Sequence, residues 1–114
     1  MYSCGDNNRG QLGIKFNFTT KTIPTPVWSE GDLAEGYKIV RIGCGSEHAI
    51  ALSENGVLFI WGSFDFGVLG FEAKTDFKEP KRMDASLFGN NKIISISAGI
   101  FFLLKNNPSI LFLI

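Results

Sequence analysis

One stretch of this sequence occurs twice, and that repetition limits the possible folds more than any other feature. Residues 2–13 (YSCGDNNRGQLG) align with residues 59–70 (FIWGSFDFGVLG) at an offset of 57 residues, 62 − 5. The matched positions are Gly5, Gly10, Leu12 and Gly13 with Gly62, Gly67, Leu69 and Gly70. A second block, 39–45, matches 93–99 at an offset of 54, 99 − 45. Self-similarity at this spacing is typical of one supersecondary unit that stacks on its own copies.

A third correspondence, between residues 52–61 and 104–114, extends the repeat to the last residue of the sequence. Residues 1–114 are therefore divided into repeat blocks of about 1–61 and 62–114, and the second copy becomes degenerate after residue 99. Both ends of the sequence fall inside a unit. We expect the chain to be part of a longer array, with further repeats in the complete protein.

The segment around residue 50 predicts an antiparallel hairpin. Residues 48–52 alternate between small and larger side chains, 53–56 (SENG) form a turn signal, and 57–61 (VLFIW) read as a strand. Because that second strand is apolar on both faces, it must be covered on both sides, as in sheets stacked around an axis. The longer connections, 14–38 and 71–92, are expected to be loops.

Short helical signals occur inside those two connections. Ser29 to Asp32 and Asp84 to Phe88 both begin with a residue that favours a helix N-cap. We therefore expect each loop to contain a helical turn or two.

The composition describes a packed and electrically balanced protein. With 45% hydrophobic residues the chain can form a core, and 11 basic residues balance 11 acidic ones, which disfavours direct binding to nucleic acid. The apolar runs 100–104 and 110–114 have five residues each, far short of the roughly 20 of a membrane span. No charged segment followed by an apolar one opens the sequence, and Cys4 and Cys44 lie far apart. We expect an intracellular protein, cytoplasmic or nuclear, with reduced thiols and no signal peptide.

No residue pattern indicates catalysis. Cys44 and His48 have a spacing found in metal sites, but zinc needs three or four protein ligands and only Cys4 remains to join them. His48 is the only histidine, no nucleophile elbow occurs, and the glycine-rich segments lack the lysine of a phosphate loop. We expect a protein that is not an enzyme and that has no metal or cofactor.

The repeated residues resemble the repeat of the regulator of chromosome condensation family. That repeat consists of an apolar strand, Cys-Gly or Ala-Gly, two further residues, a histidine, a short second apolar strand, a turn glycine, Trp-Gly and Gly-Gln-Leu-Gly. The structural motif is carried here by Gly5, Gly10, Gly13, Gly45, His48, Gly56, Trp61, Gly62, Gly67 and Gly70. Cys4 stands in place of the tryptophan and Val68 in place of the glutamine.

The resemblance implies an all-β fold: about two blades' worth of a seven-bladed β-propeller, with antiparallel strands, glycine-rich turns and an incomplete ring. It also implies that His48 is a partly buried structural residue that bonds to backbone at the turn of the repeat.

The candidate partner-binding residues are the polar tips of the glycine-rich turns. They are Asp6, Asn7, Asn8 and Arg9 in the first copy and Phe64, Asp65 and Phe66 in the second. Exposed phenylalanines are costly unless a neighbouring blade or a partner covers them. These residues can therefore contact a protein partner or pack on the next blade, and the sequence leaves both alternatives open.

The sequence favours a protein–protein interaction module over the two alternatives that the resemblance raises. The first alternative is part of a guanine-nucleotide exchange factor for a Ran-class small GTPase, which would make a small GTPase the partner. The second is a truncated product without independent function, because repeat stacks generally need at least three units.

Overall fold

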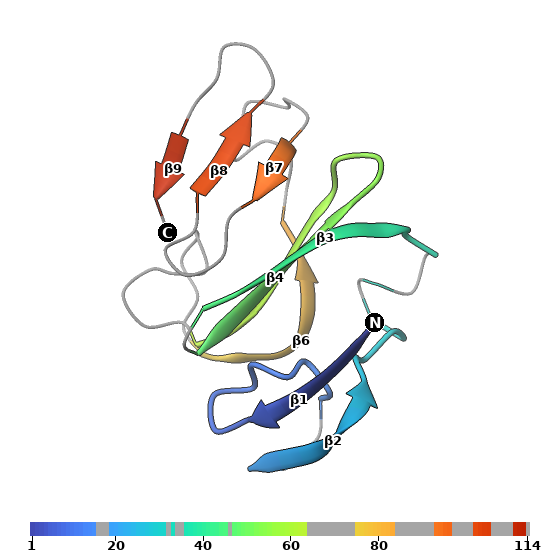
Figure 1. The fold of residues 1–114 in the computed structure, drawn as a ribbon, viewed down its shortest axis with the longest axis vertical. Helices are drawn as coiled ribbons and strands as arrows, with labels where there is room; N and C mark the ends of the chain where they lie inside the picture. Colours follow the sequence, from blue (N-terminus) through green and yellow to red (C-terminus); the bar gives the residue numbers. More distant parts are fainter. Residues whose placement is uncertain are drawn as a thin grey trace.

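The chain forms an all-β structure of three antiparallel sheets in a computed structural model (Figure 1). Described in full are residues 1–15, 19–31, 33, 36–45, 47–63 and 75–83, together with the backbone of 93–96, 102–105 and 111–113. Within these residues there is no helix and the sheets do not close into a ring. This arrangement confirms the predicted fold class of an incomplete propeller.

The first sheet contains two strands and the second contains four. The first pairs β1 (Tyr2–Asp6) with β2 (Thr20–Pro26). The second, in the order β3-β4-β5-β6, contains β3 (Ile39–Cys44), β4 (His48–Ser53), β5 (Leu58–Gly62) and β6 (Phe77–Arg82).

The third sheet contains β7 (Ile93–Ile96), β8 (Phe102–Lys105) and β9 (Leu111–Leu113). It lies against the second sheet, where β7 contacts β3 and β4 (Figure 1). The predicted sequence blocks do not coincide with single sheets, since β3 to β6 draws residues from both 1–61 and 62–114.

The strand registers repeat in the same way as the sequence. Ser3 pairs with Thr25 and Gly5 with Lys21, and the equivalent pairs in the next sheet are Ile60 with Lys81 and Gly62 with Phe77. In both sheets the register shifts at the residue between these two pairs, which is Cys4 in β1 and Trp61 in β5. The strand β1 is therefore the structural equivalent of β5, and β2 that of β6.

The predicted hairpin is confirmed, with Leu52 opposite Leu58 and Gly56 in the turn at a φ of +84°. The two long connections were predicted wrongly, because each contains a strand, β2 or β6, rather than loop and helical turns. Prolines in both segments suggested loops, but proline is tolerated in a strand at the edge of a sheet, where both strands lie. Ser29–Gly31 is not helical, and residues 84–88 lie outside the described residues.

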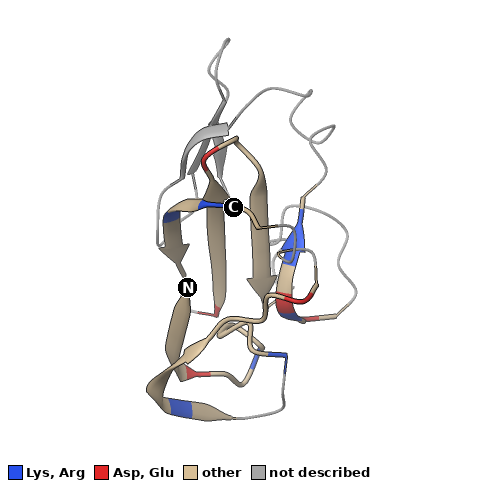
Figure 2. Ribbon diagram, turned by 90° about the vertical axis from the view of Figure 1, so that its right-hand side faces the viewer, with Lys and Arg blue, Asp and Glu red and all other residues tan. Residues whose placement is uncertain are grey.

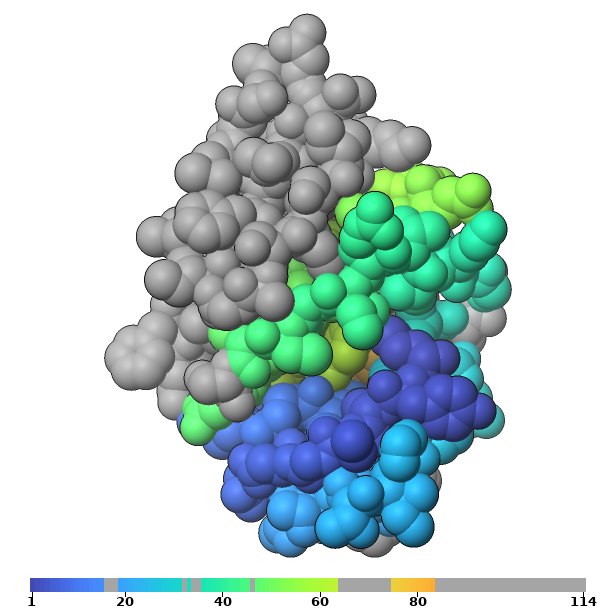
Figure 3. Space-filling model, viewed as in Figure 1, coloured from blue at the N-terminus to red at the C-terminus, as the bar shows by residue number. Residues whose placement is uncertain are grey.

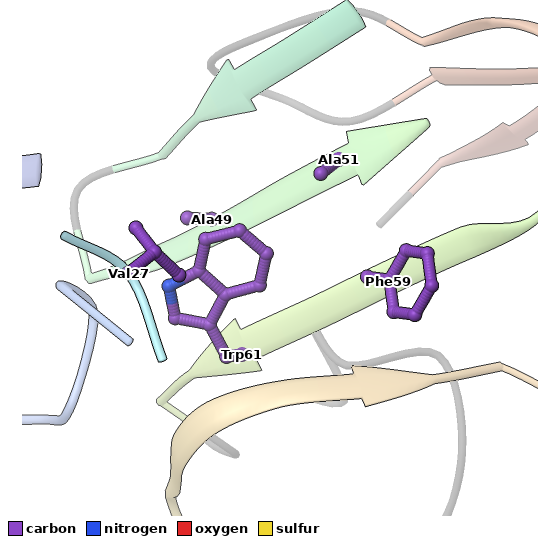
Figure 4. Packing of buried hydrophobic residues seen from close by; sticks show 5 residues of the cluster. All are labelled: Val27, Ala49, Ala51, Phe59 and Trp61. Carbon is purple, nitrogen blue, oxygen red and sulfur yellow. The ribbon is translucent and has the colours of Figure 1, made fainter. Parts of the chain in front are cut away.

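The core lies on both faces of strands β4 and β5, in which every residue is buried. On one face the small side chains of Ala49 and Ala51 lie opposite Trp61 and Phe59 (Figure 4). Val27 from the segment after β2 packs against this cluster. The aromatic rings fill the space that the alanines leave, so the face can pack closely against the N-terminal sheet.

Candidate functional site

The turn between β1 and β2 is held in shape by its own polar groups. Asn7 is only 7% exposed, and its side-chain oxygen Oδ1 accepts a hydrogen bond of 3.1 Å from the Leu12 amide. The Asp6 carboxylate is exposed and accepts bonds from the side chains of Asn8 (2.7 Å) and Gln11 (3.0 Å). The turn therefore presents Asp6 and Asn8 to solvent, while Asn7 stabilises it from within.

Arg9 forms ion pairs that connect this turn to two segments of the next sheet. Its guanidinium binds Asp76 through two bonds, from Nε to Oδ2 at 2.7 Å and from Nη2 to Oδ1 at 3.0 Å. Its Nη1 lies 3.4 Å from Oε2 of Glu47. A two-bond contact between a guanidinium and a carboxylate fixes orientation as well as distance. The turn, the β3–β4 connection and the start of β6 thus form one surface, called here the loop face.

Trp61 holds the end of the same turn from the other sheet. Its indole Nε1 donates a hydrogen bond of 2.9 Å to the Gln11 carbonyl. A Cβ on Gly13 would lie only 2.6 Å from that nitrogen, and Gly13 has a φ of +66°. Glycine is needed because the indole lies directly against the backbone. The two motif residues, although 48 positions apart (61 − 13), are parts of one contact.

His48 supports the connection between β3 and β4. Its side chain is buried beneath Gly45, where an added Cβ would meet the imidazole, and the Gly45 amide bonds the His48 carbonyl at 2.8 Å. Gly62 passes close to the backbone of Glu47 and His48, and Ser63 donates to the Glu47 carbonyl at 2.8 Å. Burial lowers the pKa of His48 below its ordinary value of 6.5, because the charged imidazolium loses hydration. These contacts give His48 a structural position that fixes Glu47 on the loop face.

The predicted partner-binding residues have different surroundings in the structure. Asp6 and Asn8 are exposed, Asn7 is buried, and Arg9 contacts the next sheet through Asp76. Phe64, Asp65, Phe66, Gly67 and Gly70 lie outside the described residues. Asp76 and Glu47 could not be predicted from the sequence, because no local pattern links them to an arginine 67 and 38 positions away.

A concave region lies between β1 and β3, and it is called here the β1–β3 groove. It has a volume of about 370 Å³ and is lined by residues that include Tyr2, Cys4, Ile42, Cys44 and Trp61. Figure 3 shows the N-terminal strand beside the blue-green β3 segment. Both cysteines are exposed free thiols. Among the described residues, no three His, Cys, Asp or Glu side chains are grouped so that they could hold a metal ion.

The described residues form no large surface patch of a single charge sign. Basic and acidic positions are interspersed along the ribbon (Figure 2). In the part of the chain that the structure describes, no helix is long and apolar enough to cross a membrane.

The chain is similar to proteins that share this repeat. Family models described as "Regulator of chromosome condensation (RCC1) repeat" match residues 1–52 and 39–68. The probable E3 ubiquitin-protein ligase HERC6 of Homo sapiens is 34% identical over 103 residues, which cover 87% of this chain and 9% of the relative. The ultraviolet-B receptor UVR8 of Arabidopsis thaliana is 31% identical over 99 residues, covering 87% of this chain and 21% of the receptor.

The fold is also found in a solved structure. The crystal structure of human WBSCR16 superposes with a TM-score of 0.76 at 26% identity, over 92% of this chain and 26% of that one. The chain spans only a small part of each of these proteins. Its repeat residues, the repeated strand register and the matching family models agree, and the chain belongs to the regulator of chromosome condensation repeat family.

Proposed function

We propose that the chain is a non-enzymatic protein–protein interaction module within a larger intracellular propeller, and that it binds its partner through the loop face. The observation that carries the proposal is the Arg9 contact, which joins three segments from two sheets into one surface. A surface fixed in this way loses little conformational entropy when it binds.

The exposed groups of the loop face suit recognition of a protein. Asp6, Asn8 and the half-exposed Glu47 offer acceptors and one amide donor at defined positions. The relatives support the same view, because a ubiquitin ligase and an ultraviolet-B receptor share this repeat although their names describe different activities. A repeat that is shared across different activities fits a role in binding.

Site-specific photo-crosslinking tests this proposal. A benzophenone amino acid at position 8 places the probe on the loop face, and the same amino acid at the exposed position 22 of β2 serves as the matched control. In cells that express the protein, we expect discrete crosslinked protein bands from position 8 and none of the same mass from position 22. Identical bands from both positions, or no bands from position 8, would contradict binding through the loop face.

A separate assay distinguishes a nucleotide-exchange factor from a binding module. The full chain is added to a Ran-class GTPase loaded with fluorescent nucleotide, and the rate of nucleotide release is measured. We expect no acceleration over the intrinsic rate, because exchange needs several loops of a complete ring and a wedge that displaces the nucleotide, whereas this chain supplies about two repeats. A clear acceleration of nucleotide release would contradict the proposal of a binding module and would indicate an exchange factor.

A further inference from the structure

The turn between β4 and β5 contains a reactive pair of residues. Asn55 is exposed and is followed by Gly56, and this is the only Asn-Gly sequence in the chain. A backbone nitrogen can attack the side-chain amide carbon of the asparagine before it, and glycine allows the closest approach because it has no Cβ. The sheet that carries this turn has four described strands, and the Glu54 amide bonds the Lys38 carbonyl at 2.8 Å. The turn therefore lies inside one unit of the chain, away from its first residues.

The side-chain carbonyl of Asn55 is polarised by a chain of two hydrogen bonds. The Val57 amide donates to Oγ of Ser53 at 2.9 Å, and that hydroxyl donates to Oδ1 of Asn55 at 2.5 Å. A donor at a carbonyl oxygen stabilises the negative charge that develops there when a nucleophile adds to the carbon. Ser53 is only 1% exposed, so little water competes for its hydroxyl. The turn thus holds an electrophilic carbon together with a donor that stabilises its addition product.

Asn8, in the turn between β1 and β2, has the opposite surroundings. It is also exposed, but its amide nitrogen Nδ2 donates to the Asp6 carboxylate at 2.7 Å, which makes its side-chain carbon less electrophilic. The next residue is Arg9, whose Cβ hinders the approach of its own backbone nitrogen. The chain therefore contains two exposed asparagines in turns, of which Asn55 is arranged to react and Asn8 is not.

We propose that Asn55 is a site of spontaneous modification, at which it converts to aspartate and isoaspartate with the Ser53 hydroxyl as the donor to its carbonyl oxygen. The Gly56 nitrogen forms a bond to Cγ of Asn55 and gives up its proton, and the Cγ–Nδ2 bond breaks to release ammonia. Water, the only co-reactant, then adds to either carbonyl of the resulting succinimide and opens the ring. This inference goes beyond the proposed binding function and does not rest on it.

The isoaspartate product lengthens the turn. It routes the main chain through Cβ and Cγ of residue 55, which adds one backbone atom inside the turn that the 3.0 Å bond from the Gly56 amide to the Ser53 carbonyl closes. The turn sets the register of the hairpin, here Leu52 opposite Leu58. Because every residue of β4 and β5 is buried, a change in this register disturbs the core. We expect isoaspartate to destabilise the central sheet, and aspartate, which keeps the backbone, to have little effect.

Peptide mapping by mass spectrometry, after incubation of the full chain at mildly alkaline pH, tests the site. We expect modification at position 55 to be at least about tenfold faster than at position 8, because the glycine and the Ser53 donor both favour it. Enzymatic methylation of isoaspartate should label the peptide that contains position 55. Asn55→Gln, whose longer side chain does not form the five-membered ring, should give no label there.

The variant Ser53→Ala tests the part played by the hydroxyl. Since the Gly56 amide must leave the Ser53 carbonyl before its nitrogen can react, hydrogen exchange at that amide is measured in the same samples. Divided by this exchange rate, the modification rate of Ser53→Ala should be at least about threefold below that of the parent chain. The ratio corrects for any general loosening of the turn by the substitution.

Urea denaturation of the separated products tests the consequence. We expect the isoaspartate form to unfold at a lower urea concentration than Asn55→Asp, which should match the parent chain. Three results would overturn the proposal: equal modification at positions 8 and 55, an equal normalised rate in Ser53→Ala and the parent, or an isoaspartate form as stable as Asn55→Asp. None of these results changes the crosslinks expected from position 8, so the loop-face proposal is tested separately.

Discussion

Gly13 and Trp61 depend on each other at the level of single residues. The indole donates to the Gln11 carbonyl and lies against the Gly13 backbone, where a Cβ would come within 2.6 Å of Nε1. Gly36 has a similar φ, +71°, but an added Cβ would have no neighbour within 4 Å. Alanine substitutions at the two glycines therefore distinguish two contributions to the free energy of unfolding: the strain of a left-handed backbone and the loss of the indole contact.

Gly13→Ala should lower the free energy of unfolding by about 3 kcal/mol, because it combines backbone strain with displacement of the indole. Gly36→Ala should cost only about 1 kcal/mol, the strain alone. Urea denaturation followed by tryptophan fluorescence measures both. Equal effects of the two substitutions would show that the indole contact contributes nothing.

His48 makes stability depend on pH. Its pKa is lowered in the folded chain by burial, so the unfolded chain binds the proton more tightly. The contribution of a neutral His48 is fully present above its ordinary pKa of 6.5 and is lost as the pH falls from there toward the lowered folded pKa. The imidazole Cε1 resonance of the only histidine should titrate with a midpoint below 6.5.

A comparison with His48→Gln, which carries no titrating group, isolates this effect from the carboxylates. The difference in unfolding free energy between the parent and this variant should fall as the pH is lowered below 6.5. A difference that stays constant from pH 8 to pH 5 would mean that the folded and unfolded pKa values are equal.

At the level of elements, the ion pair between the N-terminal turn and the start of β6 differs in expected strength from the ion pair beside β3 and β4. The side chains of Arg9 and Asp76 are 25% and 22% exposed and share two bonds, whereas Lys38 and Glu54 are 74% and 66% exposed and 3.9 Å apart. Partial burial and two-bond geometry reduce screening by water. The Arg9–Asp76 pair should therefore contribute to the free energy of unfolding, whereas the Lys38–Glu54 pair should not.

A double-mutant cycle on Arg9→Gln and Asp76→Asn should give a coupling energy of about 1 kcal/mol. The same cycle on Lys38→Gln and Glu54→Gln should give a value near zero. Both are obtained from urea denaturation at low salt. Should the two cycles give the same coupling, the Arg9 contact would be no more than a surface ion pair.

For the whole molecule, the sheet β3 to β6 is the central element. The strand β7 of the third sheet contacts β3 and β4, and the N-terminal turn and Val27 pack on the face that carries Phe59 and Trp61. A sheet of two strands such as β1–β2 is marginal by itself. The N-terminal sheet should therefore persist only while the central sheet is folded.

Phe59→Ala tests this dependence at a distance. Phe59 is fully buried and its ring meets Tyr37 edge to face at 5.0 Å, so its removal should cost about 3–5 kcal/mol. Hydrogen exchange should show loss of protection in β1 and β2 together with β4 and β5. Amides of β1–β2 that stay protected in this variant would show that the N-terminal sheet folds independently.

The features that could be predicted from the sequence are those whose residue pattern is local or repeated. The hairpin at 48–61 was predicted because small and apolar residues alternate around a glycine turn, and the family was indicated by glycines at fixed spacing. The strands β2 and β6 were missed, since an edge strand with prolines and charges has no apolar pattern of its own.

The candidate site was predicted only in part, for a related reason. The exposure of Asp6 and Asn8 follows from their polarity, but the burial of Asn7 depends on where its side chain meets the Leu12 amide. The partners of Arg9 lie on other elements, at positions that only the packing of two sheets brings together.

The sequence by itself determined the repeat, the all-β class and the residues that form the glycine-rich turns, because these depend on spacing and backbone preference within one unit. Only the tertiary structure decided which turn packs on which sheet and which polar tips remain exposed. The physical reason is that these properties arise from contacts between units. A contact between residues far apart in the chain produces no pattern in the sequence around either of them.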